Sequence, residues 1–273
     1  MFESVHPSNE TLPTPPAGKA EDMPYEYITG DLGKGLVILC DHASNKIPEH
    51  YNHLGLPPEQ FERHIAYDIG AAKVVRQLAG ILGVPALLGR YSRLLIDLNR
   101  GADDPTMIMK LSDGAVIPGN RNIDQNETRI RIARYYRPYH EKIDEILDRG
   151  IAMGKPPAIL SVHSFTPFWK DVPRPWHATI LWDKDARLPE PMLRALRAQT
   201  GIITDDNVPY SGELEGDCMN QHGTRRGLAH SLIEIRQDQI NTAEGVHKWA
   251  QRLGVMMQDI LKTPGLNQIR HSG

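Results

Sequence analysis

Three apolar runs of this sequence carry residues that are suited to metal and acid–base chemistry. His42 closely follows the run 36–40, and His163 ends the run that begins at Ala158. Glu234 interrupts another apolar stretch, where a carboxylate is costly unless it is paired. Because neutral imidazole is a favoured zinc ligand, two histidines delivered by separate runs suggest a zinc site.

A catalytic zinc site needs a third protein ligand and an open position. Asn45 lies three residues after His42, but a side-chain amide is a poor donor to zinc. Asp68 is anionic and lies in a segment with a helical pattern. We therefore expect Asp68 to be the third ligand, with Glu62 and Asn45 as weaker alternatives.

An Asn-Arg pair ends the run Arg93-Leu-Leu-Ile-Asp97-Leu-Asn99-Arg100. The apolar residues of this run predict a strand over residues 93–98. A guanidinium bonds both oxygens of a carboxylate in a planar fork, and an amide adds a neutral donor. Asn99 and Arg100 therefore predict a site for a small carboxylate at the end of this strand.

Ordinary structural roles remain open for each of these residues. An isolated histidine after an apolar run, such as His42 or His163, is often a hydrogen-bonded turn residue. His222 lies on a loop before the Glu234 stretch, where it either lines a site or caps an element. The ion pairs that would compete with a catalytic role are Glu234 with Arg236 or Arg225, and Arg93 or Arg100 with Asp97 or Asp103.

Alternating strand and helix patterns place these residues in an α/β fold. We expect a three-layer sandwich with helices on both sides of a mainly parallel or mixed sheet. Ligands of such sheets bind beyond the carboxyl ends of the strands, so the candidate residues would meet in one crevice. The predicted strands are 36–40, 84–88, 93–98, 158–163, 178–182 and 232–235, and the predicted helices are 58–82, 126–150, 190–199 and 242–261.

No linker divides the chain of 273 residues. We predict an N-terminal arm over residues 1–30, a single catalytic domain over 31–265 and a C-terminal tail over 266–273. The long connections 101–125 and 205–227 carry Gly, Pro, Asn and Asp, and we expect them to serve the site.

Composition narrows the partners and the compartment. With a net charge of −3, the chain has no polyanion-binding character, so nucleic acid is not an expected partner. No apolar stretch reaches the ~20 residues that span a bilayer, and the N-terminus lacks a signal-peptide pattern. Cys40 and Cys218 make no disulfide framework, which predicts a reducing compartment, the cytoplasm. The clustered arginines expected on a solvated helix face are Arg121, Arg129, Arg131, Arg134 and Arg137.

These residues lie in motifs that resemble the N-formylglutamate amidohydrolase family. The motifs run in order from about residue 36 to 262 and cover most of the chain. The resemblance implies the phosphorylase/hydrolase-like fold that zinc carboxypeptidases and aspartoacylase share. The matching motifs are Asp41-His42-Ala-Ser-Asn45-Lys-Ile-Pro48, His64-Ile-Ala-Tyr-Asp68-Ile-Gly70, Tyr91-Ser-Arg93-Leu-Leu-Ile-Asp97-Leu-Asn99-Arg100, Arg137-Pro-Tyr-His140, Ser161-Val-His163-Ser164-Phe-Thr-Pro167 and Gly227-Leu-Ala-His230 leading to Glu234-Ile-Arg236-Gln-Asp238.

The resemblance also implies a role for each candidate residue. The chain departs from the carboxypeptidase pattern at Asn45, where that pattern has a zinc-binding glutamate, so Asp68 keeps its place as third ligand. The resulting assignments are one zinc ion held by His42, Asp68 and His163; Glu234 as general base with Arg93 polarising the scissile carbonyl; and substrate binding by Asn99, Arg100, Ser164 and His222.

The implied reaction is hydrolysis of the amide of an N-formyl or other N-acyl amino acid. N-formylglutamate, which would give formate and glutamate, is the first expectation. A carboxypeptidase-like peptide hydrolase and a relative that binds an anion without catalysis are the alternatives, and the oligomeric state is open.

Overall fold

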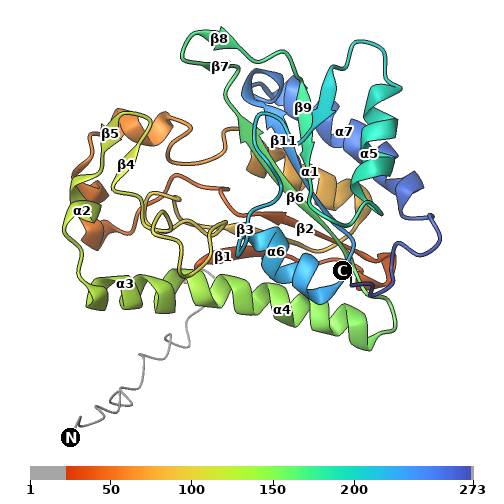
Figure 1. The fold of residues 1–273 in the computed structure, drawn as a ribbon, viewed down its shortest axis with the longest axis horizontal. Coiled ribbons are helices and arrows are strands. Elements are labelled where there is room, and N and C mark those ends of the chain that lie inside the picture. Colours follow the sequence, from red (N-terminus) through yellow and green to blue (C-terminus); the bar gives the residue numbers. More distant parts are fainter. Residues whose placement is uncertain (1–22, 272–273) are drawn as a thin grey trace, which may run out of the picture.

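A mixed seven-stranded sheet forms the centre of the protein, in a computed structural model that describes residues 23–271 (Figure 1). The strand order is β1-β3-β2-β6-β11-β9-β10. Strands β3, β2, β6 and β11 run parallel, β1 is antiparallel at one edge, and β9 with β10 reverses direction at the other. The strands are β1 (Tyr25–Ile28), β2 (Leu36–Cys40), β3 (Ala86–Gly89), β6 (Ala158–Phe165), β9 (Ala178–Leu181), β10 (Thr204–Asp206) and β11 (His230–Arg236).

Helices pack on both faces of this sheet. On one face, Ile38 of β2 shares an apolar cluster with Val75 of α1 and Trp249 of α7. On the other face, Leu39 of β2 shares a cluster with Ile143 of α4. The alternation of β2 side chains between the two clusters follows from the pleat of a strand that is buried on both sides. The helices are α1 (Ala71–Leu82), α2 (Pro118–Arg121), α3 (Gln125–Arg131), α4 (Arg137–Ala152), α5 (Pro189–Arg197), α6 (Cys218–His222) and α7 (Ala243–Ile260).

Most predicted elements are confirmed. Five of the predicted strands correspond to β2, β3, β6, β9 and β11, and the α/β class with a mixed sheet is as expected. The predicted helix 126–150 is α3 and α4, joined by a π-helical turn over Ile132–Tyr136. Two small hairpins, β4–β5 (Leu111–Ser112 and Ala115–Val116) and β7–β8 (Phe168–Trp169 and Val172–Pro173), and the short strand β10 were not predicted.

The predicted strand 93–98 is wrong, because this segment is a buried stretch of turns. Its carbonyl groups are bonded by side chains rather than by a neighbouring strand: Asn120 Nδ2 donates to Leu94 O at 2.7 Å, and Arg131 Nη1 donates to Leu95 O at 2.9 Å. A short apolar run alone does not distinguish a strand from a buried loop. The segment still carries the Asn-Arg pair into the interior.

The single predicted helix over residues 58–82 is also wrong. A 3-10 turn at Pro58–Glu62 is followed by an irregular segment, and α1 begins only at Ala71. Gly70 has φ 86°, a left-handed conformation that interrupts a helix, and a Cβ there would lie 2.4 Å from Ile240 O. Asp68 therefore lies on a loop, where its backbone N–H donates to His42 O at 2.9 Å.

Residues of both predicted terminal segments contact the domain. β1 lies within the predicted arm and pairs with β3 at the sheet edge. Asn267, in the predicted tail, donates to Gly35 O at 2.7 Å and to Pro156 O at 2.9 Å. The remainder of the predicted arm, residues 1–22, and the last two residues of the tail lie outside the described residues.

Arg131 differs from the prediction that the clustered arginines lie on a solvated helix face. The side chain is only 1 % exposed, whereas Arg129 on the same helix is exposed. Besides Leu95 O, it bonds Asn120 Oδ1 at 2.7 Å and Glu127 Oε1 at 2.7 Å. Arg131 thus fastens the helical layer to the buried loop that carries the predicted anion site.

We expect Arg131→Met to destabilise the protein by about 3 kcal/mol, because it leaves buried acceptors without a donor. The matched control Arg129→Met removes an exposed arginine of the same helix and should change stability by less than about 0.5 kcal/mol. Urea unfolding measures both. Equal stability of the two variants would contradict the role given to Arg131.

Candidate active site

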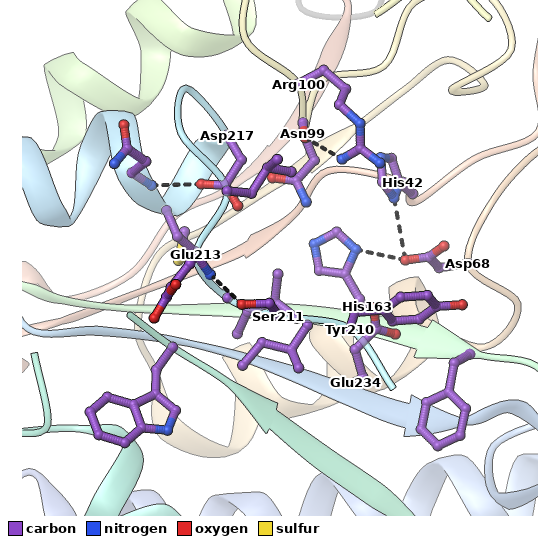
Figure 2. A pocket seen from close by; sticks show the side chains of 18 of the residues that line it. His42, Asp68, Asn99, Arg100, His163, Tyr210, Ser211, Glu213, Asp217 and Glu234 are labelled. Atoms are coloured by element: carbon purple, nitrogen blue, oxygen red, sulfur yellow. Dashed lines mark hydrogen bonds and ion pairs between the residues drawn. The ribbon is translucent and has the colours of Figure 1, made fainter. Parts of the chain in front are cut away.

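The carboxyl ends of β2, β6 and β11 open into a cavity of about 460 Å³. His42 lies two residues beyond β2, His163 lies in β6, and Glu234 lies in β11 directly across the strand pair from His163. Figure 2 shows His42, Asp68 and His163 turned toward one another, with Glu234 beside His163. Residues far apart in the sequence therefore meet in one place, as predicted.

His42, Asp68 and His163 form a buried set of potential metal ligands. Asp68 Oδ2 lies 2.7 Å from His163 Nδ1 and 3.4 Å from His42 Nδ1. One ligand atom from each residue falls within 4.8 Å of the others. Two imidazoles with one carboxylate are a typical protein ligand set of a catalytic divalent metal.

A carboxylate behind each imidazole fixes its orientation. Asp97 Oδ1 lies 2.7 Å from His42 Nε2, and Asp41 Oδ2 lies 3.1 Å from His163 Nε2. Because a carboxylate accepts, each Nε2 donates to its carboxylate and each Nδ1 faces the site. Such carboxylate–histidine pairs are the usual outer support of metal ligands. Tyr139 in turn donates its hydroxyl to Asp41 Oδ1 at 2.7 Å.

The same atoms test whether a cation fits. His42 Nδ1 is buried and has no hydrogen-bond partner, a costly state that a metal ion would relieve. Burial lowers the pKa of His163, but its bonds to Asp41 and Asp68 outweigh burial and raise that pKa well above the usual value. A divalent cation would take the place of the proton on His163 Nδ1. The site therefore fits a metal ion.

Glu234 is a buried carboxyl group beside this ligand set. Burial and the nearby negative charge of Asp68 raise its pKa to about 7. Its Oε2 atom has no hydrogen-bond partner. The competing ion pairs do not form, because Arg236 bonds Asp238 and Arg225 lies 4.0 Å from Glu215. Glu234 is thus able to take up and release a proton near neutral pH.

Arg93 lines the cavity and pairs with two carboxylates. Its Nη2 lies 2.8 Å from Asp97 Oδ2, and its Nη1 lies 3.8 Å from Asp68 Oδ1. The ion pair with Asp97 is one of the alternatives considered from the sequence, and it is present. Arg93 therefore offsets negative charge on Asp97, which orients His42, and on Asp68, a member of the ligand set.

Asn99 and Arg100 form what we call the carboxylate anchor, and both line the cavity. Asn99 Oδ1 accepts from the backbone N–H of Cys218 at 3.1 Å. Arg100 donates to Asn99 O at 2.9 Å, and its nearest carboxylate is Asp104, at 4.0 Å. In Figure 2, the Asn99 side chain reaches from the upper wall toward His163. The Asn99 amide nitrogen and much of the Arg100 guanidinium remain able to bind an anion.

Two residues predicted to bind substrate have other contacts. The Ser164 hydroxyl donates to Ile69 O at 2.9 Å, so it supports the loop that carries Asp68. His222 is buried but lies outside the cavity wall, where it bonds His140 and Asp144.

The weaker alternatives for the third ligand are also occupied elsewhere. Asn45 donates to Phe61 O at 2.9 Å and approaches Glu62 Oε1 at 3.4 Å. Neither Asn45 nor Glu62 lines the cavity.

Sequence reasoning did not find the wall of the cavity that faces the ligand set. In Figure 2, Glu213 and Asp217 lie across the cavity from Asp68. Asp217 caps α6 by accepting from Asn220 N at 2.7 Å, and burial raises its pKa to about 6. In the sequence, the feature that pointed to this wall is the length of the connection 205–227, which supplies most of it. Its main residues are Trp182, Asp183, Tyr210, Glu213, Leu214 and Asp217.

Comparison with known proteins assigns the family. The sequence model of the N-formylglutamate amidohydrolase family matches residues 34–241, which include the ligand set, the carboxylate anchor and Glu234. This chain belongs to the N-formylglutamate amidohydrolase family. It is accordingly a hydrolase of the amidohydrolase type.

Solved structures share the fold of this chain. The crystal structure of gene product Atu2144 from Agrobacterium tumefaciens is 31 % identical, with a TM-score of 0.82, over 89 % of this chain and 96 % of that one. An N-formylglutamate amidohydrolase from Ralstonia eutropha JMP134 shares the fold, with 21 % identity and a TM-score of 0.69 over 88 % of this chain and 97 % of that one. No protein of curated function matches.

Within residues 23–271, the helices are all too short or too polar to cross a membrane.

We expect Asp97→Asn to weaken divalent-metal binding by about 10–100-fold, because it removes the carboxylate that orients His42. Competition with a chelator measures the affinity. Asp185→Asn is the matched control, since Asp185 is a buried carboxylate that pairs with Arg187 outside the cavity. Equal affinities of both variants and the unmodified protein would contradict the proposed support of His42.

Proposed function

We propose that this family member is a zinc-dependent amidohydrolase that cleaves the amide of an N-formyl or other N-acyl amino acid. N-formylglutamate, giving formate and glutamate, is the substrate that we expect. The observation that carries the proposal is the meeting of a metal-ligand set, an unpaired carboxyl group and a carboxylate anchor in one cavity. Each of the three supplies one requirement of amide hydrolysis.

His42, Asp68 and His163 would hold the zinc ion. When bound, zinc acts as a Lewis acid that makes water acidic near neutral pH and polarises a carbonyl group. The protein's own contribution is to keep the imidazoles oriented, through Asp97 and Asp41, so that both Nδ1 lone pairs face the site.

Glu234 moves the proton. A carboxyl group with a pKa of about 7 accepts a proton from the attacking water as the water oxygen bonds to the acyl carbon. Glu234 then returns this proton to the amine nitrogen as the C–N bond breaks. A bond to water or to the leaving nitrogen would also satisfy its unpaired Oε2 atom.

Arginine and asparagine side chains orient the substrate. The carboxylate anchor would hold the α-carboxylate of the N-acyl amino acid, which places the amide against Glu234 and the ligand set. Arg93, on the same wall as Asp68, would stabilise negative charge that develops on the acyl oxygen. We further propose that the enzyme works in the cytoplasm, since Cys40 and Cys218 are both free thiols.

Glu234→Gln should keep the metal and lose turnover, with kcat falling at least ~100-fold, because the amide cannot shuttle a proton. Glu213→Gln, which alters a carboxylate on the opposite wall, should stay within about threefold. Steady-state kinetics and metal analysis on the same preparations check both.

In the unmodified enzyme, kcat/KM should fall as the pH drops through about 7 or lower, because Glu234 must be deprotonated to act. A bound cation moves this decline in kcat/KM to lower pH by favouring the Glu234 carboxylate.

Full turnover in Glu234→Gln would remove this residue from the mechanism.

Arg100→Ala should lower kcat/KM for an N-formyl amino acid by about 100-fold, the cost of losing a charge-assisted pair. An N-formyl alkylamine, which has no carboxylate, should be hydrolysed equally well by the variant and the parent. An equal loss of kcat/KM on both substrates would show that Arg100 does not bind the substrate carboxylate.

A substrate panel separates the proposed activity from a carboxypeptidase-like one. The panel comprises N-formyl and N-acetyl forms of glutamate and of neutral and basic amino acids, together with short peptides, all assayed with added zinc. The proposal expects hydrolysis of N-acyl amino acids that is abolished by a chelator. Preference for peptides over every N-acyl amino acid would replace it with the peptidase assignment.

A further inference from the structure

A second pair of histidines lies just outside the cavity and takes no part in the proposed chemistry. His140 belongs to α4 and His222 ends α6, the short helix that lies next to α4 in Figure 1. His140 Nδ1 and His222 Nε2 are 2.7 Å apart, and both side chains are buried. We call these two residues the histidine pair.

The outer nitrogens of the histidine pair both face pure acceptors. His140 Nε2 lies 3.1 Å from Leu98 O, and His222 Nδ1 lies 3.0 Å from Asp144 Oδ1. A carbonyl and a carboxylate only accept, so both outer nitrogens carry protons. If both rings were neutral, the unprotonated inner nitrogens would face each other at 2.7 Å, and their lone pairs would repel. One further proton must therefore lie between the inner nitrogens.

The hydrogen-bond partners identify His222 as the donor to His140. Burial and the neighbouring His222 lower the pKa of His140 to about 3, so His140 is the acceptor. His222 faces Asp144, which Arg226 also bonds at 2.7 Å. His222 thus donates from both nitrogens, to Asp144 and to His140.

The geometry of the histidine pair fits a shared proton rather than a second metal ion. His140, Cys218 and His222 do offer ligand atoms within 4.8 Å of one another. However, the two rings are nearly parallel, at 15°, and their nitrogens face each other directly, whereas imidazoles on tetrahedral zinc hold their nitrogens roughly 3.3 Å apart. Burial also raises the pKa of the Cys218 thiol well above its usual value, which disfavours the thiolate that a metal needs.

Among residues 23–271, the histidine pair is one of three hydrogen-bonded connections between α6 and the anchor segment, residues 98–100. It reaches Leu98 O through His140. The first N–H of α6, at Cys218, holds Asn99 Oδ1 at 3.1 Å. The third connection reaches Arg100 O: the Tyr136 hydroxyl donates to it at 2.8 Å and accepts from Gln221 of α6 at 2.8 Å. Each residue of the anchor segment is therefore tied to the same short helix.

We propose that the histidine pair positions the carboxylate anchor, by binding α6 to the Leu98 carbonyl and thereby fixing how Asn99 and Arg100 face the substrate. The inference rests on the proposed function, because it assigns the anchor to a substrate carboxylate. His140 and His222 are positioning residues, since neither lines the cavity.

Two substitutions of His140 separate positioning from simple packing. His140→Phe keeps a ring against Tyr136, 4.1 Å away between centroids, but removes both hydrogen bonds. His140→Gln keeps one acceptor and one donor and is the rescue variant. Asp148→Asn, which removes an exposed partner of Arg226 next to the pair, is the control.

Kinetics on two substrates give the first readout. For an N-formyl amino acid, His140→Phe should raise KM about tenfold while kcat stays within about threefold, and His140→Gln should restore KM to within about threefold. For an N-formyl alkylamine without a carboxylate, all variants should match the parent. Equal losses on both substrates, or failure of His140→Gln to restore KM, would overturn the proposal.

Two measurements that do not depend on turnover test this inference separately from the proposed function. In protein labelled with 15N-histidine, a scalar coupling between His140 and His222 nitrogens is expected across the N–H···N bond. Amide hydrogen exchange at Asn99 and Arg100 should be faster in His140→Phe and normal in His140→Gln. If the parent hydrolyses no N-acyl amino acid, the proposed function fails. If the scalar coupling is absent, or amide exchange at Asn99 and Arg100 is unchanged in His140→Phe, the role proposed for the histidine pair is wrong.

Discussion

Charge balance in a buried site is the constraint on which the proposed active site depends. Asp41, Asp68 and Asp97 are buried carboxylates, and the Arg93 guanidinium offsets one of their three charges. With neutral imidazoles and a protonated Glu234, two negative charges remain, which one divalent cation would balance. Isolated charge in a protein interior is expensive, so this arrangement is stable only with a proton or a metal ion in its centre. Electrostatics as well as ligand geometry therefore support the proposed metal site.

The sheet brings the two sides of this site together. Neighbouring parallel strands place His163 and Glu234 opposite each other, while the backbone bond from Asp68 to His42 O closes the ligand set. Residues 93–98, which lead into the anchor segment, have no strand partner. Side chains such as Arg131, which donates to Leu95 O, bond their carbonyls, so the position of the anchor segment depends on the helical layer rather than on the sheet.

Much of this arrangement was predictable, because an apolar run marks a buried strand. His42 follows such a run and His163 ends one, and the parallel order of β2, β6 and β11 makes the carboxyl-terminal parts of these strands converge. Residues 93–98, just before the anchor pair, were misassigned as a strand because hydrogen bonds from distant side chains, which no local pattern encodes, replace strand pairing there. The supporting carboxylates Asp41 and Asp97 stand beside predicted residues, yet only the fold shows which imidazole each one orients. His222 was placed in the cavity because a loop histidine gives no sign of its direction.

Anomalous diffraction from crystals of the 273-residue chain grown with zinc tests the central claim most directly. Data collected on both sides of the zinc absorption edge should show one strong peak per chain, bounded by His42 Nδ1, a carboxylate oxygen of Asp68 and His163 Nδ1. Absence of a peak there, or a peak at the histidine pair in its place, would contradict the account.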